Sequence, residues 1–287
     1  MKFNHKAFSL VELSIVLIII ALLAVFVNNS NNLISSYRLR VAERYTMNSP
    51  VASMPNLVLW FEPTSQASLN NFETINGSEV SNWRDINPTS DTKYNVVQFA
   101  NNRPTYIKNC INSLPCLRFD GVDDYFSYDG KFLTNSDYTV IVVEKRRSDR
   151  DENYFLAGNS GSTNGNLYLG YRANSVATFA QYNNDFDVAV EPYVEPVARI
   201  HVFTYSSKSD DPKTYFLNGV FLNLTGGNSA EAATGLSSYP ASSIGNYKNA
   251  AYYDGDIAEI IMFDRALKSD ERRAIESYLC QKWAIAI

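Results

Sequence analysis

The chain opens with an almost uninterrupted apolar run at 8–27, in which Ser9, Glu12 and Ser14 are the only polar positions. Twenty helical residues rise about 30 Å, close to the thickness of the hydrocarbon core of a bilayer. The leader before the run carries two lysines, and basic flanks stay on the cytoplasmic side of a membrane. The pattern therefore predicts one membrane-spanning helix with a cytoplasmic N-terminus and an exported body after Val27.

The helix is expected to continue beyond this segment. Residues 28–32 are poor helix formers, but apolar and aromatic side chains then recur every four residues. This spacing, which predicts one face of an amphipathic helix, is carried by Leu33, Tyr37, Val41 and Tyr45. Prolines at 50 and 55 predict the end of the helix and a linker, so we expect a helical segment at 8–50 and a body at 51–287.

The body has the pattern of a β protein. Short apolar and aromatic runs alternate with Asn-Gly and Asp-Gly pairs, which is typical of strands joined by tight turns. The clearest runs lie at 57–61, 94–99, 138–143, 166–171, 199–205 and 213–217. The expected fold class is mainly β, an antiparallel two-sheet sandwich or jelly roll that follows the N-terminal helix.

A short C-terminal helix is expected from Asp270 to Trp283. Ser269 is the expected N-cap, and the acidic residues in the first turn interact favourably with the helix dipole. The side chains expected to form its buried stripe are Ile275, Tyr278, Leu279 and Trp283.

Composition narrows the function classes. Hydrophobic residues make up 45% of the 287 residues, which excludes a disordered chain. The 19 Tyr and 16 Phe favour a β-rich body, because aromatic side chains pack well on a pleated surface. A formal net charge of −5 argues against a nucleic-acid partner, which would need a basic surface.

Three interpretations of the N-terminus compete. A cleaved secretory signal would need small residues just before its cleavage site, and the apolar run ends Val-Phe-Val-Asn-Asn instead. A plain membrane anchor leaves Glu12 unexplained, because a carboxylate in a membrane span is costly and normally has a partner. The third interpretation supplies that partner.

Residues 6–13, Lys-Ala-Phe-Ser-Leu-Val-Glu-Leu, resemble the class III signal of type IV prepilins. The resemblance implies that prepilin peptidase removes leader 1–7 between Ala7 and Phe8, and that Phe8 is then N-methylated. It also implies that Glu12, the fifth mature residue, pairs with the N-terminal amine of a neighbouring pilin subunit in the filament, so that two buried charges offset each other. Ala7 departs from the family, which prefers Gly before the cut.

The body resembles the laminin-G-like branch of the concanavalin A-like lectin/glucanase superfamily. The resemblance spans 57–283 and rests on the segments 104–106, 117–125, 215–219, 243–246, 255–267, 269–272 and 278–283. It implies a two-sheet jelly roll that binds a glycan or a protein surface, sometimes with calcium.

Signals for an enzyme are lacking in the sequence. The glucanases of this superfamily carry a Glu-x-Asp-x-(x)-Glu strand, and no Glu in this chain is followed two places later by Asp. His201, the only His of the exported body, lies on an alternating strand and is expected to be a packing or edge residue. We therefore expect a noncatalytic protein.

Asp120, Asp123 and Asp124 are candidate calcium ligands, because calcium prefers clustered carboxylates and backbone carbonyls. The alternative is a tight turn in which Asp side chains bond to the backbone. Asp254 and Asp256 flank another Gly turn and carry the same pair of interpretations. No cofactor is certain, and calcium is the one candidate.

Aromatic and cysteine residues give further candidates. Side chains that could stack on a sugar ring are Tyr171, Tyr182, Tyr252 and Tyr253, although packing is the expected role of each. An oxidising periplasm would let Cys110 and Cys116 form a small disulfide; the alternative is two unpaired thiols. Cys280 is expected to be a buried hydrophobe.

These observations predict a pilin-like or pseudopilin-like subunit of a type IV pilus or type II secretion filament. The helix would hold it in the bacterial inner membrane, and the head would lie in the periplasm or outside the cell. The alternative is a membrane-anchored binding protein or adhesin of the envelope that does not assemble into filaments.

Overall fold

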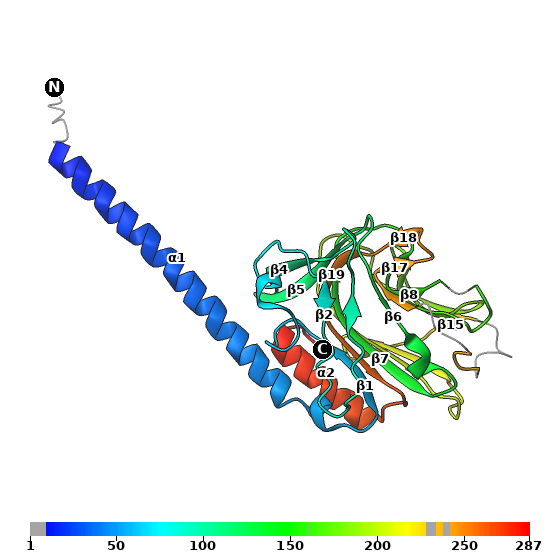
Figure 1. Ribbon diagram of the computed structural model, residues 1–287. Coiled ribbons are helices and arrows are strands. Elements are labelled where there is room, and N and C mark those ends of the chain that lie inside the picture. Colours follow the sequence, from blue (N-terminus) through cyan, green and yellow to red (C-terminus); the bar gives the residue numbers. More distant parts are fainter. Residues whose placement is uncertain (1–9, 160, 228–233, 238–241) are drawn as a thin grey trace, which may run out of the picture. The chain divides into compact units, whose positions relative to one another are not determined.

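The computed structural model describes residues 10–159, 161–227, 234–237 and 242–287, and of residues 24–32 only the backbone (Figure 1). The chain forms two compact units, residues up to Val41 and Ala42–Ile287. The second unit thus begins inside the first helix.

The N-terminal helix α1 (Leu10–Met47) is continuous over 38 residues, so the polar run at 28–32 does not interrupt it. Ala7 and Phe8 lie outside the described residues. Within the part of the chain that the structure describes, no helix is both long and apolar enough to cross a membrane, so the spanning helix expected over 8–27 is not confirmed.

The body is built from two antiparallel sheets. The first has eight strands: β1 (Leu57–Phe61), β4 (Thr105–Ile111), β5 (Leu114–Asp120), β7 (Tyr138–Arg146), β12 (Arg199–Tyr205), β13 (Lys213–Leu217), β14 (Val220–Leu222) and β19 (Asp254–Phe263). Their order is β14-β13-β12-β7-β19-β5-β4, and β1 also pairs with β19.

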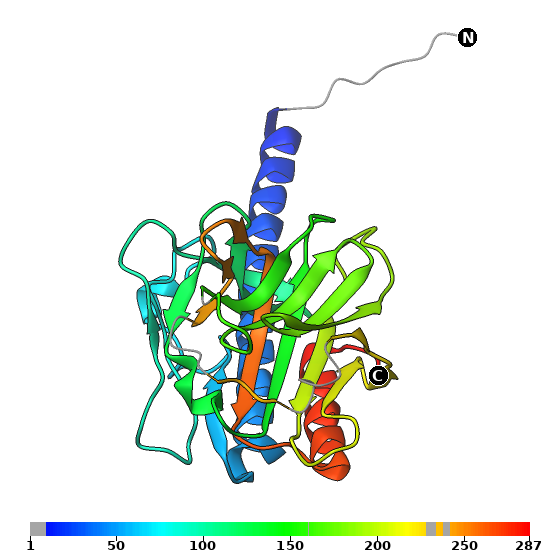
Figure 2. The same ribbon diagram turned by 90° about the vertical axis from the view of Figure 1, so that its right-hand side faces the viewer.

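The second sheet has seven strands and lies toward the viewer in Figure 2. In order they are β15 (Thr225–Gly226), β11 (Asn184–Ala189), β10 (Val176–Gln181), β9 (Leu167–Ala173), β8 (Asn153–Gly158), β16 (Ser242–Ile244) and β6 (Phe126–Tyr128). The smaller elements are the pairs β2 (Asn82–Trp83) with β3 (Val96–Val97) and β17 (Asn246–Tyr247) with β18 (Ala251–Tyr252), and the 3-10 helices η1 (Pro50–Ser53), η2 (Asn71–Glu73) and η3 (Gly130–Leu133).

The first sheet is buried on both faces. Val142 and Ile260 belong to one apolar cluster with Phe155 and Leu169 of the second sheet. Their neighbours Ile141 and Ile261 point the other way, into a cluster with the C-terminal helix α2 (Ser269–Trp283), which Figure 1 shows beside β1. Strands covered on both faces read as continuous apolar runs, which explains the patterns of β7 and β19.

Helix α2 confirms the expected buried stripe, since Ile275, Tyr278, Leu279 and Trp283 are all buried. Two details differ from expectation. The N-cap is Lys268, whose backbone N–H donates to the Glu271 carboxylate at 2.9 Å, so Ser269 is already helical. Cys280 is only half-buried, because it flanks the stripe and does not belong to it.

The end of α1 packs differently from the expected amphipathic face. Ala42 and Thr46 are buried, whereas Tyr45 is 39% exposed. Thr46 Oγ1 accepts a hydrogen bond from Lys282 Nζ of α2 at 2.8 Å. The two buried side chains at this end of α1 are thus small, one apolar and one polar, and a search for large apolar residues at helical spacing does not detect them.

A buried ionic cluster surrounds Lys282. Its Nζ lies 3.1 Å from Glu62 Oε2, directly after β1, and 3.0 Å from Glu259 Oε2 of β19. Glu259 also accepts hydrogen bonds from the indoles of Trp60 and Trp283, each at 2.8 Å. The cluster joins β1, β19 and α2 through buried charges, and the hydrogen bond from Lys282 to Thr46 connects it to the end of α1.

Candidate functional site

The turn after β5 brings the three candidate aspartates together. Their carboxylate oxygens lie within 4.8 Å of one another. Asp120 Oδ1 accepts the backbone N–H groups of Val122 at 2.8 Å and Asp123 at 3.2 Å, which is an Asx-type turn. Asp124 Oδ2 accepts the N–H of Asp120 at 3.0 Å. The turn interpretation therefore describes what these side chains do in the fold.

The same turn leaves acceptor oxygens over. Asp123 Oδ2 accepts from the Asn102 amide at 2.9 Å, and within the described residues the second oxygens of Asp120, Asp123 and Asp124 accept no hydrogen bond. Burial and the nearby charge of Asp120 raise the pKa of Asp124 to about 7. Crowded carboxylates with spare oxygens suit a hard cation, although calcium needs six or more oxygens, so other ligands must complete the shell.

A polar cavity adjoins the turn. It has a volume of about 360 Å³ and lies along β6 and β16. It is lined by Tyr125, Ser127, Tyr128, Asp129, Asn159, Ser242, Ser243 and Asn246. Two lining residues are sequence neighbours of residues at the turn: Tyr125 follows Asp124, and Asn246 follows Gly245. Gly245 packs closely against the turn, because a Cβ atom added to it would lie only 3.1 Å from the carbonyl oxygen of Asp124. The cavity and the acidic turn thus share one stretch of backbone.

The tyrosine candidates separate by burial. Tyr171 and Tyr253 are fully buried and cannot stack on a sugar ring. Tyr182 and Tyr252 are half-buried, and the Tyr252 ring centroid lies 6.5 Å from that of Tyr125. Tyr125, which the sequence pattern did not single out, is the half-buried tyrosine that lines the cavity.

His201 belongs to an enclosed network between the sheets. Its Nε2 lies 2.9 Å from Glu144 Oε1, and its Nδ1 lies 2.9 Å from the Tyr215 hydroxyl. Burial lowers the pKa of His201. Burial opposes ionisation of Glu144, but hydrogen bonds from His201 and Tyr253 outweigh it, so the pKa of Glu144 is lowered. Because His201 lies on a central strand, it is a packing residue and not an edge residue.

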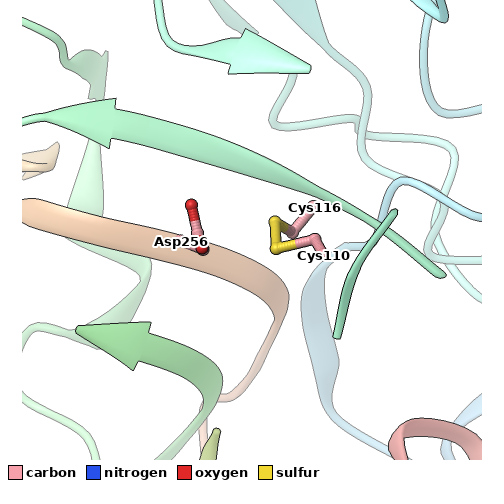
Figure 3. Close-up of side chains that lie close together, drawn as sticks. All are labelled: Cys110, Cys116 and Asp256. Carbon is pink, nitrogen blue, oxygen red and sulfur yellow. A yellow bond between two sulfur atoms is a disulfide. The ribbon is translucent and has the colours of Figure 1, made fainter. Parts of the chain in front are cut away.

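Cys110 and Cys116 form a disulfide across the β4–β5 hairpin, with their Cα atoms 5.8 Å apart. Figure 3 shows Asp256 of β19 beside the sulfurs. Asp256 is held by Arg118 Nε at 2.7 Å and Lys145 Nζ at 3.3 Å. Bonded sulfurs and a carboxylate that already has two cations do not fit a metal. Asp254, two residues earlier, pairs in register with Asp120.

Sequence reasoning missed several buried charged residues. Glu144 follows Val142 and Val143 in β7, and Glu259 interrupts the apolar run of β19. A charged residue within a run that is covered on both faces is a usable signal, because such a residue needs a buried partner. Those partners lie far away in the sequence, as with Lys282 and Glu62.

Comparison with known families identifies the N-terminus only. Residues 2–28 match the family model of the prokaryotic N-terminal methylation motif. No curated protein matches the chain. The match supports a prepilin-type N-terminus, which implies a structural subunit that prepilin peptidase processes.

Comparison with solved structures concerns the fold. Trypanosoma rangeli sialidase in complex with sialic acid is 17% identical, with a TM-score of 0.55 over 86% of this chain and 38% of that chain. The carbohydrate-binding module CBM40 of Ruminococcus gnavus IT-sialidase, bound to alpha2,6 sialyllactose, is 13% identical, with a TM-score of 0.44 over 57% of this chain and 95% of that chain. At this identity the likeness to the sialidase shows a shared β-sandwich, and it spans little more than a third of that enzyme.

Proposed function

We propose that the chain is a noncatalytic pilin-like or pseudopilin-like subunit of a type IV pilus or type II secretion filament. The observation that supports this proposal is the match of residues 2–28 to the methylation motif. The matched segment includes Glu12, which lies in the first turn of α1. In this proposal prepilin peptidase cuts between Ala7 and Phe8 and methylates Phe8. Glu12 then pairs with the N-terminal amine of a neighbouring subunit.

The N-terminal segment would anchor the subunit in the inner membrane before assembly, with its N-terminus in the cytoplasm and the head outside it. The Cys110–Cys116 disulfide supports this placement, because disulfides persist in oxidising compartments. The alternative, an envelope adhesin that stays in the membrane, shares this topology and differs only in assembly.

The head is proposed to be a laminin-G-like jelly roll that binds a glycan or a surface protein. Support comes from the polar cavity, whose volume of about 360 Å³ falls within the range of small-molecule sites. Tyr125 would stack on a sugar ring, and Ser243 and Asn246 would offer groups to its hydroxyls.

Calcium is proposed to bind at the adjoining turn. Each of the three aspartates has one carboxylate oxygen that accepts no hydrogen bond within the described residues. These oxygens of Asp120, Asp123 and Asp124 would coordinate the ion. Bound calcium would offset the repulsion between these carboxylates and hold Tyr125 in place. No chemical step is assigned to the ion.

The processing step is tested by intact-mass measurement of the protein from membranes of cells with and without prepilin peptidase. The proposal expects a chain that starts at Phe8 and carries one extra methyl group, in peptidase-positive cells only. A chain that starts at Met1 in both strains would reject the pilin pathway and leave the anchored binding protein.

Ligand binding is tested on a glycan array with the detergent-solubilised full chain. Tyr125→Ala should weaken binding at least tenfold, because the variant loses the aromatic ring on which the sugar would stack. Tyr182→Ala is the matched control, since Tyr182 is also half-buried but does not line the cavity. Equal loss in both variants would place the ligand elsewhere.

A further inference from the structure

Lys213 begins β13 of the first sheet and reaches the second sheet. Its Nζ donates to the Asn184 backbone carbonyl of β11 at 2.8 Å. The rings of Phe179 and Phe186 flank it, with centroids 5.6 Å and 4.7 Å from Nζ. Only 5% of the residue is exposed. Within the part of the chain that the structure describes, the amine thus lies against aromatic rings and has one neutral acceptor.

Lys213 differs from the buried Lys282 and the half-buried Lys145 in its lack of a counter-charge. Lys282 contacts Glu62 and Glu259, and Lys145 contacts Asp256. Within the described residues, no carboxylate lies within ion-pair distance of Lys213 Nζ. An unpaired buried cation is costly, so the neutral amine is favoured. Burial lowers the pKa of Lys213 to about 7, although the charge of Asp185 opposes this.

A cavity of about 360 Å³ lies beside Lys213. Lys213 lines it together with Phe186 of β11 and Phe221 of β14. Asp210 and Asp211 line it from the preceding loop, and both are exposed. Among the described residues, Asp185 is the carboxylate whose charge acts on the amine, and Asp210 and Asp211 are the acidic groups of the cavity lining. Lys213 therefore has no counter-charge within ion-pair distance among the described residues, and it borders a cavity that is large enough for a small molecule.

We propose that Lys213 is a modification site at which small aldehydes or ketones that enter this cavity form a reversible imine. The lone pair of the neutral amine attacks the carbonyl carbon, and a carbon–nitrogen bond forms. The carbonyl oxygen leaves as water with the two amine hydrogens. Hydrolysis reverses the step, and neither direction needs an oxidant or a reductant. This site is independent of the filament and of the cavity at Tyr125.

The test uses the full chain in detergent with formaldehyde as the probe and cyanoborohydride as the trap. Methylation of each lysine is followed by peptide mass spectrometry between pH 6 and pH 9. At pH 7 about half of an amine with this pKa is neutral, against less than about 0.1% of an ordinary lysine. Lys213 should react at least tenfold faster than the exposed Lys131 and Lys268.

The pH profile separates this amine from one that is merely accessible. The Lys213 rate should level off above pH 8, whereas the rates of exposed lysines should rise about tenfold per unit to pH 9. Lys282 serves as the buried, ion-paired control and should stay unmodified. An unmodified Lys213, or a rate that rises to pH 9, would overturn the proposal.

Two variants on one strand sharpen the result. Phe221→Glu places a carboxylate in the cavity and should shift the inflection of the Lys213 profile upward by about one pH unit or more. Val220→Glu, at the neighbouring exposed position outside the cavity lining, should leave the profile unchanged. If Phe221→Glu does not fold, the wild-type profile alone decides.

Discussion

At the scale of single residues, Asp124 has a structural role, but its ionisation lowers the stability of the folded protein. Its carboxylate holds the backbone of Asp120, yet burial and the neighbouring Asp120 raise its pKa from 3.8 to about 7. At a pH between 3.8 and about 7, this carboxyl group binds more protons in the folded protein than in the unfolded chain. The free energy of unfolding should therefore fall as the pH rises from about 4 to about 7.

Asp124→Asn should remove this loss, because the amide oxygen can still accept the Asp120 N–H while the charge is gone. In EDTA at pH 8 the variant should gain about 1 kcal/mol of unfolding free energy, measured by urea denaturation, with little gain at pH 4. Asp149→Asn, an exposed control, should change neither value. A loss of stability at pH 8 would show that the carboxylate itself is needed.

The same substitution tests calcium. Calcium should stabilise the wild type above pH 7 and progressively less below it, because protonation of Asp124 competes with the ion. Asp124→Asn should abolish most of that gain, as measured by the shift of the thermal midpoint on adding calcium. An equal shift in both proteins would place the ion elsewhere.

At the scale of elements, the sequence pattern was sufficient for strands whose own residues carry the signal. β1, β7, β12 and β13 lie where runs of apolar and aromatic residues predict them. The run at 94–99 yields only β3, Val96–Val97, because Val97 and Phe99 are exposed and find no sheet to cover them. A run of apolar residues thus predicts a strand well where the fold buries those residues, and poorly where it leaves them exposed.

The candidate site was predictable only in part, for the same reason. The proximity of Asp120, Asp123 and Asp124 follows from their spacing in one turn. Tyr125 and Asn246 meet at the cavity through the fold, with more than a hundred residues between them, and no local pattern links them. Long-range pairs such as Lys282 with Glu62 were equally hidden.

The disulfide stabilises the β4–β5 hairpin, whose turn contains Asn112 and Ser113 in the left-handed region. Because Cys110 and Cys116 close only a short loop, chain entropy predicts a gain of about 2 kcal/mol. Replacing both cysteines by Ser should lower the unfolding free energy by about that amount in urea. Cys280→Ser is the control and should have a smaller effect, and an equal loss would contradict the entropic account.

The ionic cluster at α2 makes a stronger prediction. Lys282→Met would leave the buried carboxylates of Glu62 and Glu259 without their cation, which costs about 3–5 kcal/mol. Unfolding in urea should show a loss of that size, and Lys268→Met, on the exposed N-cap, should show almost none. Glu62→Gln in the Lys282→Met background should recover part of the loss; no recovery would mean that charge is not the cause.

At the scale of the whole molecule, the two units carry different kinds of information. The methylation motif lies within 2–28, in the unit that ends at Val41, and it concerns processing and assembly. The acidic turn, the cavity and Lys213 all lie in the unit Ala42–Ile287. Ligand binding and assembly should therefore be separable by mutation, since the residues proposed for each lie in different units.

Glu12→Ala tests that separation together with the proposed function. If Glu12 neutralises the amine of a neighbouring subunit, the variant should lose most of its incorporation into filaments, because the buried amine would have no partner. Cleavage, glycan binding and the thermal midpoint of the head should stay unchanged. Ser14→Ala is the control: the Ser14 hydroxyl donates to the Leu10 carbonyl of its own helix, so this variant should assemble normally. The measurement is the fraction of the protein recovered in sheared filaments relative to membranes.

Two outcomes would instead favour the anchored envelope protein. One is normal incorporation of Glu12→Ala into filaments. The other is a wild-type protein that is displayed on the cell surface but is absent from the filament fraction.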